Sequence, residues 1–421
     1  MAQSEPGKSN RVIFLIDMNA FFFMCEASVN HDLKGKAAAV AGDPRRRSGI
    51  ILSASYEARR MGVRTTMLIH EAREVCPDIV LVPPSHGLYD AKSRQVMSLL
   101  SEYTPVVQQN SIDEAWLDLT GCESLFGRPA AIAATIMDRI KNELDLWCSI
   151  GISYNKFLAK MACEMKKPLG ITELWHDDLQ TKLWPLPVGD MYGVGKKSAA
   201  RLHELAVFTI GELAATDVST LIKVFGRSGL GMHQLANGAD DSIVTEFPER
   251  ASRSIGRSTT LTHDITDIAF AKSVIRSLAE EVGEDARKQE MPGCTVSIVI
   301  KYADFKSITR QHSVSPTYLT KEIYEAGSKL LDENWDQRRP VRLLGISLSG
   351  LEKGLMLQPG LFDLDRSGSG GRSGPGVSQG IKKIKEDKLE KTIDSLKSRF
   401  GSEKIRRASV IQPPADKPHP M

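Results

Sequence analysis

The residues best able to do chemistry are three acids, which lie in two short strings far apart in the chain. Asp17 ends an apolar run that begins at Val12, and Asp113 and Glu114 stand at the head of another apolar run. Both runs predict buried β-strands. A buried carboxylate is costly unless it is protonated, paired or bound to a cation. If the two strands are neighbours, the three acids converge on one point, as in a site for two metal ions.

Each acid also has a plainer interpretation, because an aspartate at the end of a strand commonly serves as a turn or cap residue. Two apolar strands that both carry acids favour the metal site over that alternative. Carboxylate oxygens suit Mg²⁺, and Mg²⁺ at such a site indicates phosphoryl transfer. The acids alone do not name the substrate.

Two neighbouring strings contain residues that could contact a nucleotide. Phe21 and Phe22 are either ordinary core or a wall against a sugar, since a packed ring leaves no room for an extra hydroxyl. Tyr56 and Arg59 share a helix face, with Ser53 just before them. An arginine beside hydroxyl groups at a helix start can bind phosphate, although a solvated charged helix is the alternative.

Lysines and glycines form two further candidate sites. Lys167 follows a predicted strand and helix, and the alternative there is a lysine-rich surface. Gly193 and Gly195 precede a helix, and such a turn exposes backbone N–H groups to a phosphate. The turn resembles a helix–hairpin–helix contact with a DNA backbone, although Gly-x-Gly alone is common in ordinary turns.

Composition limits the classes of protein. A chain of 421 residues predicts two to four domains, and 41% hydrophobic with 25% charged residues is ordinary for a soluble globular protein. The net charge of +3 permits nucleic acid as a partner without arguing for it. The six cysteines include no C-x-x-C pair, which favours reduced thiols in the cytoplasm over a zinc site. No apolar run predicts a signal peptide or a membrane span.

The elements that must position these residues follow from hydrophobic periodicity. In the first half the pattern predicts strands at 12–18, 37–41, 49–53, 106–109, 114–119 and 149–153, helices at 56–61, 90–104, 130–144 and 154–165, and a turn or helix at 21–29. Residues 253–350 have a βαββαβ order, which predicts a four-stranded sheet with both helices on one face and the other face free to bind. A basic amphipathic helix is expected at 382–400.

Four strings in this order resemble the Y-family lesion-bypass DNA polymerases, in the branch of DNA polymerase IV. They are Asp-Met-x-Ala-Phe-Phe at 17–22, Ser-Tyr-Glu-Ala-Arg at 55–59, Ser-Ile-Asp-Glu-Ala at 111–115, and Gly-Ile-Ser-x-Asn-Lys-Phe-Leu-Ala-Lys at 151–160, followed by Lys-Pro. The resemblance covers about residues 11–350. It implies an α+β multidomain right-hand polymerase with a ferredoxin-like palm, small fingers, a helical thumb with a helix–hairpin–helix, and a βαββαβ little finger.

The implied domain order is a disordered arm at 1–10, palm at 11–26 and 78–170, fingers at 27–77, thumb at 171–240, linker at 241–252, little finger at 253–352, and a flexible tail at 353–421. The resemblance implies a template-directed, low-fidelity, distributive DNA polymerase for translesion synthesis, without a proofreading exonuclease. Primer-template DNA and dNTPs would be its substrates, and it would act as a cytoplasmic monomer.

The same resemblance implies a role for each candidate residue. Two Mg²⁺ ions would be held by Asp17, Asp113, Glu114 and the Met18 carbonyl, and the triphosphate by Tyr56, Arg59 and Lys167 with Ser53 near it. Phe22, beside Phe21, would be the steric gate against ribonucleotides. The Gly193–Gly195 turn would grip the DNA backbone. Phosphates would meet basic residues on the little-finger sheet, namely Arg253, Arg257, Lys301, Lys306, Arg310 and Arg342.

Two other classes compete with this interpretation. A non-catalytic clamp and DNA adaptor on the same fold would lose the acids, yet all three are present. A catalytic subunit that needs a protein activator is disfavoured by the intact string from Tyr56 to Arg59.

The chain departs from the family pattern at two places and carries one further motif. Many relatives have aspartate where this chain has Asn19, and small residues where it has Phe23 and Met24. The string Gln358-Pro359-Gly360-Leu361-Phe362 resembles the peptide that bacterial polymerases insert into the sliding clamp. Gln358, Leu361 and Phe362 fit that peptide, and Pro359 replaces its usual leucine.

Overall fold

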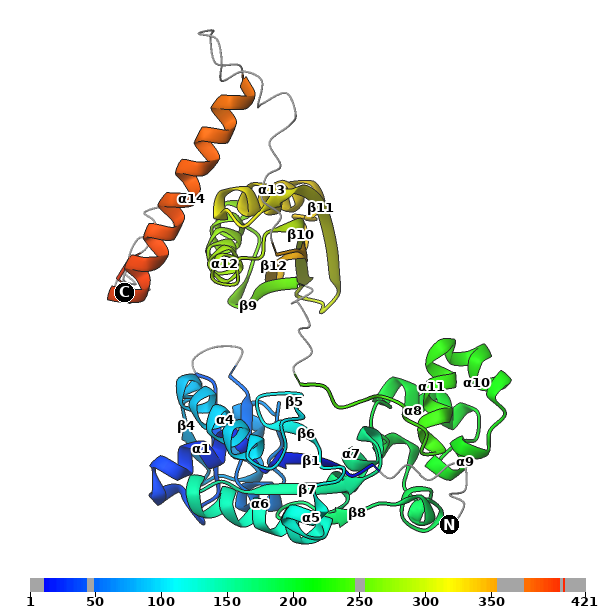
Figure 1. The fold of residues 1–421 in the computed structure, drawn as a ribbon. Helices are drawn as coiled ribbons and strands as arrows, with labels where there is room; N and C mark the ends of the chain where they lie inside the picture. Colours follow the sequence, from blue (N-terminus) through cyan, green and yellow to red (C-terminus); the bar gives the residue numbers. More distant parts are fainter. Residues whose placement is uncertain (1–10, 44–48, 247–253, 354–374, 402–403, 406–421) are drawn as a thin grey trace, which may run out of the picture. The chain divides into compact units, whose positions relative to one another are not determined.

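The computed structural model describes residues 11–43, 49–246, 254–353, 375–401 and 404–405. The chain divides into two compact units, residues 1–248 and 249–421, and each has its own hydrophobic core (Figure 1). The expected arm at 1–10 and the clamp-type peptide at 358–362 lie outside the described residues. Within the described ranges, no helix combines the length and apolar character needed to cross a lipid bilayer.

A five-stranded sheet, here called the palm sheet, forms the centre of the first unit. Its order is β5 (Val107–Gln109), β6 (Glu114–Asp118), β1 (Ile13–Met18), β7 (Cys148–Ser153), β8 (Ile171–Glu173). β1 is antiparallel to both β6 and β7, and its register sets Asp17 directly opposite Glu114. The two strings that carry the acids are therefore neighbouring strands, which was the condition for the three acids to converge.

Different helices cover the two faces of the palm sheet. The face with Phe14 and Ile16 packs into the core with α4 (His86–Ser101) and α6 (Pro129–Leu144), and α1 (Phe21–Val29) joins it. The other face, with Ile13 and Leu15, is covered by α7 (Lys156–Met165). Since side chains alternate along a strand, Asp17 shares the α7 face with Ile13 and Leu15.

The close approach of α7 to the sheet depends on a glycine in β7. A Cβ at Gly151 would lie 1.9 Å from the Ala159 carbonyl oxygen and 2.4 Å from the Cys163 amide nitrogen. No side chain fits there, so α7 can lie directly on the sheet. This contact brings the polar side chains of α7 within reach of the acids on β1 and β6.

Smaller elements complete the first unit. The expected fingers region has the sheet β3 (Ile51–Ala54), β2 (Ala38–Ala41), β4 (Val80–Val82), with η1 (His31–Leu33), α2 (Tyr56–Arg60) and α3 (Ile69–Val75). After α5 (Glu123–Phe126) and the palm sheet come the short helices of the expected thumb, η2 (His176–Asp178), η3 (Leu179–Leu183), η4 (Val188–Asp190), α8 (Lys196–Glu204), α9 (Ile210–Ala215), α10 (Val218–Phe225) and α11 (Arg227–Ala236). They share one apolar core with α7.

The second unit has the predicted βαββαβ order. Its elements are β9 (Ser254–Ile265), α12 (Ile268–Lys288), β10 (Gly293–Tyr302), β11 (Ser307–Thr317), α13 (Thr320–Asn334) and β12 (Val341–Leu351). The strands pair antiparallel in the order β11-β10-β12-β9, and α12 and α13 pack on the sheet and on each other.

The basic helix expected at 382–400 is α14 (Pro375–Phe400), which begins earlier than predicted. Charged side chains, both acidic and basic, connect the described part of α14 to α12 and α13. Glu390 is buried and Asp394 pairs with Arg287 of α12, whereas Leu389 and Phe400 are 58% and 51% exposed.

Candidate active site

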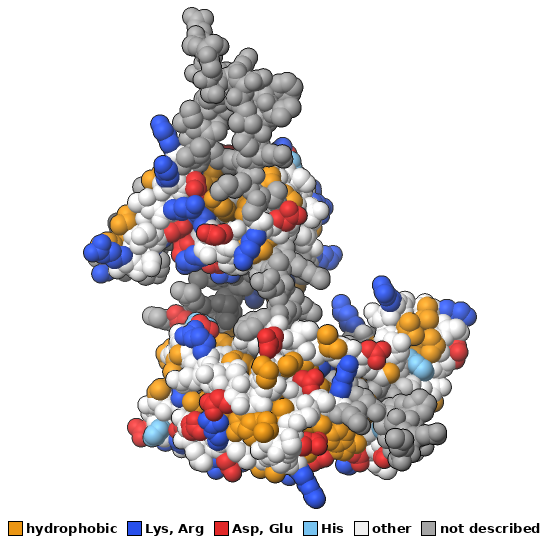
Figure 2. Space-filling view, viewed as in Figure 1, with side chains coloured by type: hydrophobic (Ala, Val, Ile, Leu, Met, Phe, Trp, Pro, Cys, Tyr) orange, Lys and Arg blue, Asp and Glu red, His pale blue; other side chains and the backbone are white. Residues whose placement is uncertain are grey.

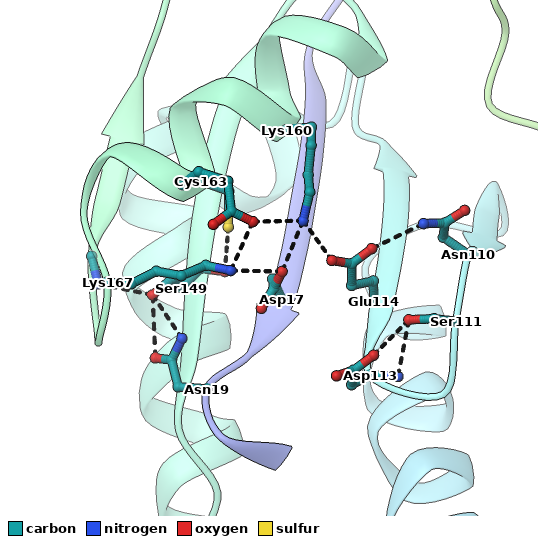
Figure 3. Close-up of polar contacts among 12 residues, drawn as sticks. Asp17, Asn19, Asn110, Ser111, Asp113, Glu114, Ser149, Lys160, Cys163 and Lys167 are labelled. Carbon is teal, nitrogen blue, oxygen red and sulfur yellow. Dashed lines mark hydrogen bonds and ion pairs between the residues drawn. The ribbon is translucent and has the colours of Figure 1, made fainter. Parts of the chain in front are cut away.

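A cluster of charged side chains, here called the palm charge cluster, lies between β1, β6 and α7. It consists of Asp17, Glu114, Lys160, Glu164 and Lys167. The Lys160 ammonium lies 3.0 Å from Asp17, 2.5 Å from Glu114 and 2.7 Å from Glu164 (Figure 3). The Lys167 ammonium lies 2.8 Å from Asp17 and 2.9 Å from Glu164. Two cations therefore compensate three carboxylates.

Strand alternation and helical spacing together build this cluster. Asp17 and Glu114 point to the α7 face because they continue the stripe formed by Leu15 and Trp116. On α7, Lys160 and Glu164 are four residues apart, so they lie on the same side of the helix. Lys167 follows three residues after Glu164, just beyond the end of α7.

Burial and pairing shift the titration of these groups in different directions. Burial raises the pKa of Asp17, and its hydrogen bond with Glu114 adds to this shift, while Lys167 and Lys160 oppose it. Burial acts on Glu114 as well, but hydrogen bonds with Asp17 and Lys160 outweigh it and lower the pKa of Glu114. Burial disfavours the charged form of Lys160, but its three carboxylate neighbours raise its pKa. Asp17, whose pKa burial raises, is therefore the acid whose charged form would gain most from a bound divalent metal ion.

The donor set fits a divalent metal ion. Oxygen atoms of Asp17, Glu114 and Glu164 lie within 4.8 Å of one another, and carboxylate oxygens are the ligands that Mg²⁺ prefers. The third predicted acid, Asp113, is not part of this cluster. Its carboxylate accepts a hydrogen bond from the Ser111 hydroxyl at 2.6 Å, and its carbonyl accepts one from the Met18 N–H at 3.0 Å.

A cavity of about 260 Å³ brings most of the predicted residues together. It is lined by Asp17, Met18, Asn19, Ala20, Phe21, Phe22, Leu52, Ser53, Tyr56, Arg59, Thr65, Asp113 and Lys167. Of the predicted metal and nucleotide residues, only Glu114 is not among the lining residues. The cavity therefore has an acidic end, an aromatic wall and three side chains suited to phosphate.

The aromatic wall rests on a residue that the sequence did not single out. Phe22 is half-buried, and its ring stacks on Tyr89 with a centroid distance of 4.6 Å. The Tyr89 hydroxyl in turn donates to Glu26 at 2.5 Å. Phe23 and Met24 are both buried in the main core. These bulky departures therefore fill the core, while Tyr89 supports the Phe22 ring.

Two of the phosphate candidates, Tyr56 and Arg59, line the same cavity and contact each other. The Tyr56 ring is half-buried against Trp147, and the Arg59 guanidinium lies 5.1 Å from the centre of the Tyr56 ring. Arg59 also donates to the Ala54 carbonyl at 3.0 Å. Burial raises the pKa of Tyr56, so its hydroxyl stays protonated and able to donate a hydrogen bond.

Comparisons with known proteins agree with this geometry. The impB/mucB/samB family model matches residues 16–164, the C-terminal domain model of that family matches 252–361, and the HHH motif model of the IMS family matches 176–205. The chain is 52% identical to DNA polymerase IV of Clostridium kluyveri, over 96% of this chain and 99% of the relative. It is 38% identical to DNA polymerase IV 1 of Bacillus subtilis, over 97% and 94%.

The chain belongs to the Y-family of DNA polymerases, in the DNA polymerase IV group. A solved Y-family DNA polymerase chimera, Dbh-Dpo4(243-245)-Dbh, has the same fold with a TM-score of 0.72 and 25% identity, covering 81% of this chain and 99% of the chimera. The chain is accordingly a translesion, DNA-directed DNA polymerase that uses primer-template DNA and dNTPs. Membership implies dependence on a divalent metal, and nothing in the comparisons favours the non-catalytic adaptor.

The Gly193–Gly195 turn of this polymerase lies within the segment matched by the HHH motif model. Gly193 has a φ of 92°, which residues other than glycine rarely adopt. Gly195 is the N-cap of α8. The first turn of α8 carries Lys196 and Lys197. Backbone donors and basic side chains thus occur together at this helix start.

The sheet of the second unit, β11-β10-β12-β9, was expected to present basic residues on its open face, and two of the expected arginines do not lie there. Arg257 pairs with Asp285 of α12, and Arg310 donates to Asn334 of α13 at 3.1 Å. Both arginines therefore point to the side covered by helices, so their assignment to the open face is wrong. In each case strand alternation decides the side, since Arg257 has the parity of buried Ile255.

The open face is instead rich in small hydroxyl side chains. Residues with the opposite parity include Ser258, Ser297, Thr309, Ser313 and Ser347. At one end of the sheet, Lys301 and Arg342 both lie over the exposed ring of Phe305, at 5.0 and 4.7 Å from its centre. Arg253 lies outside the described residues.

Charge on the visible surface is mixed rather than concentrated. In the face shown in Figure 2, lysine and arginine side chains alternate with aspartate and glutamate over both units. This distribution agrees with the net charge of only +3.

Besides Tyr89, three residues of the site were given no role from the sequence. Lys160 and Glu164 are members of the palm charge cluster, and Asn19 lines the cavity beside Asp17. The spacing of Lys160, Glu164 and Lys167 along one helix side was a signal that could have found the first two. For Asn19 the signal was its departure from the aspartate of many relatives.

Proposed function

We propose that this chain carries out template-directed, low-fidelity, distributive DNA synthesis at the cavity beside the palm charge cluster. Two Mg²⁺ ions would be held by Asp17, Asp113, Glu114 and the Met18 carbonyl. The observation that carries this proposal is the register of β1 and β6, which sets Asp17 opposite Glu114 next to a cavity that Asp113 also lines.

The reaction forms one bond and breaks another. The primer 3′-oxygen bonds to the α-phosphorus of the dNTP, the 3′-hydroxyl loses its proton, and the bond to the bridging oxygen breaks to release pyrophosphate. Bound metal ions supply a lowered pKa for the hydroxyl and stabilisation of the phosphate charge. The carboxylates would align the attack by holding these ions.

Tyr56, Arg59 and Lys167 would hold the triphosphate, with Ser53 near it. Lys167 now pairs with Asp17 at 2.8 Å, and a metal ion on Asp17 would compete with this pair. Displacement of the lysine would free its ammonium for the phosphates. Loading of metal and of nucleotide would in this way support each other.

Phe22, supported by Tyr89 and flanked by Phe21, would act as the steric gate. A 2′-hydroxyl would overlap a ring that cannot retreat, because Tyr89 stacks behind it. Phe22→Ala should therefore raise ribonucleotide incorporation by at least about tenfold relative to dNTPs. Leu88→Ala, on the helix that carries Tyr89, is a matched control; equal sugar selectivity in the wild type and Phe22→Ala contradicts the gate.

Partners follow from the remaining features. The helix–hairpin–helix turn and the hydroxyl-rich face of the little finger would hold the DNA backbone, the latter through hydroxyl and backbone donors. Gln358, Leu361 and Phe362 would insert into a sliding clamp, and the enzyme would act as a cytoplasmic monomer. Replacing Leu361 and Phe362 with alanine should abolish clamp-stimulated synthesis and leave clamp-free synthesis intact.

Primer extension by the purified chain alone tests the function. With Mg²⁺, dNTPs and a primer-template, extension should occur opposite at least one of several defined lesions and should stop when Mg²⁺ is chelated. Absence of extension without added protein would instead favour the adaptor or the activator-dependent subunit.

A further inference from the structure

Asn19 is an almost fully buried polar residue at the turn between β1 and α1. It is 1% exposed, and it stands two residues after Asp17. Its own N–H donates to the Trp147 carbonyl at 2.7 Å, which fixes its backbone against the start of β7. None of the roles described above uses its side chain.

The carboxamide of Asn19 connects β7 with the turn that follows Lys167. Its Nδ2 donates to the Ser149 hydroxyl at 3.0 Å (Figure 3). Its Oδ1 accepts from the Leu169 N–H at 2.9 Å. The same Ser149 oxygen accepts from the Gly170 N–H at 3.3 Å. Two adjacent backbone donors of this turn are therefore held by two side chains of the palm sheet region.

The turn after Lys167 is one that needs such support. Leu169 has a φ of 58°, in the left-handed region that a leucine seldom adopts. At Gly170 a Cβ would lie 2.0 Å from the Lys166 carbonyl oxygen, so the chain folds back tightly on itself. The hydrogen bond to Asn19 ends on the strained residue itself, two positions from Lys167.

We propose that Asn19 is a positioning residue for nucleotide binding, which acts by fixing the backbone of Lys167. The turn holds Lys167 so that its ammonium reaches Asp17 at the cavity, where the triphosphate would bind. Without the Asn19 carboxamide, the Leu169 N–H loses its acceptor and the turn relaxes. The Lys167 ammonium then spends less time at the cavity. This inference rests on the proposed role of Lys167 with the triphosphate.

The chemistry of the carboxamide also indicates which substitutions at this position should be tolerated. A carboxylate at this position keeps the oxygen that accepts from Leu169 and can accept from the Ser149 hydroxyl. What asparagine adds is an N–H donor to Ser149, which completes the pair without adding a charge near Asp17. Alanine provides neither group.

Single-turnover kinetics on primer-template DNA, with dNTP concentration varied, tests the inference. Asn19→Ala should raise the apparent Kd for dNTP about tenfold with little change in the maximal rate, as expected for a lost ground-state contact. Asn19→Asp should stay within about threefold of the wild type. Ser149→Ala, which removes the partner of both Asn19 and Gly170, should shift the Kd in the same direction by a smaller factor. Asn142→Ala, on the exposed side of α6, is the matched control.

Lys167→Ala distinguishes a failure of the proposed triphosphate role of Lys167 from a failure of the proposed positioning role of Asn19. If Lys167→Ala leaves the dNTP Kd unchanged, the triphosphate role of Lys167 fails. If Lys167→Ala raises the Kd but Asn19→Ala and Ser149→Ala do not, the positioning role of Asn19 is wrong. In the double variant Asn19→Ala/Lys167→Ala, the Kd should equal that of Lys167→Ala alone; additive increases would also overturn the inference.

Discussion

Each unit of the molecule buries a group of charged side chains, and the two groups are built from different cations. In the palm charge cluster, Lys160 and Lys167 are shared among three carboxylates beside a cavity. In the second unit, Arg287 is 3% exposed at its side chain and joins α12 to α14. It donates to both carboxylate oxygens of Asp394, at 2.6 and 3.0 Å, and to the Tyr318 carbonyl at 2.8 Å.

The difference in cation distinguishes a charge cluster that can bind a ligand from an ion pair that only joins two helices. Arginine forms a planar fork that matches a carboxylate in one geometry, so the α14 contact has a fixed form. Lysine is a compact point charge that another cation can replace. The palm charge cluster has lysines, an acid whose pKa burial raises, and a neighbouring cavity. Those features together indicate cations that give way to a ligand.

The largest expected effect comes from removing one charge in the palm. Asp17→Asn should lower kcat/KM for primer extension by roughly a thousandfold, because the amide keeps the shape but loses the charge that holds metal. Asp394→Asn makes the same change in the Arg287 contact and should leave extension unchanged. Equal losses in the two variants would break the distinction between the clusters.

Removing the cation in the second unit should affect stability instead. Arg287→Ala leaves the carboxylates of Glu390 and Asp394 without this guanidinium. The free energy of unfolding of the second unit should fall by about 3 kcal/mol. The measurements are urea unfolding of the full chain and hydrogen exchange of α14. Lys288→Ala, at the next position of α12 and 60% exposed, is the control. Unchanged exchange of α14 in Arg287→Ala would show that the contact does not hold the helix.

Metal affinity should depend on pH in a direction set by Asp17. Its raised pKa means that a proton occupies the carboxylate up to a higher pH than usual, and a metal ion must displace that proton. Affinity for Mn²⁺ should therefore fall as the pH drops below this pKa, by up to about tenfold per pH unit, and be flat above it. Glu114, whose pKa is lowered, is already ionised over this range and adds no slope. Titrations of Mn²⁺ at several pH values check this, and an affinity that rises toward low pH contradicts it.

The smallest expected effect comes from replacing Lys160 of the palm charge cluster. Lys160→Met removes a cation that competes with metal, so Mn²⁺ affinity should rise severalfold, while the metal-free protein loses stability through uncompensated carboxylates. Lys141→Met, on an exposed position of α6, controls for the loss of a lysine. A weaker Mn²⁺ affinity in Lys160→Met would mean that this lysine supports the metal site rather than occupying it.

The sequence predicted the parts of the site that lie on apolar strands. The apolar run that ends at Asp17 and the one that follows Glu114 were enough to predict two buried strands, while the pairing of those strands came from the structure. Short elements such as β8 and α3 were not predicted, since a few residues carry little periodicity. The family resemblance implied that Arg257 and Arg310 on the little-finger sheet would hold phosphates, whereas strand parity directs both to the face that the helices cover.

The partners of a side chain were harder to predict than its position. Nothing local to Asn19 shows that its carboxamide meets Leu169, because that contact spans 150 positions of the chain. The same holds for α14, whose sequence predicts apolar contacts while the structure buries Glu390 and leaves Leu396 exposed. Long-range polar pairs are set by how elements pack, which a pattern along one segment does not encode.

Counting bound Mn²⁺ in the complex with primer-template DNA and a non-reactive dNTP analogue tests the central claim most directly. The wild-type chain should bind two Mn²⁺ ions, as measured by electron paramagnetic resonance. Asp17→Asn and Asp113→Asn should each lose at least one of them, while Asp394→Asn keeps both. Two ions of unchanged affinity in both palm variants would contradict the assignment of these carboxylates as the metal site.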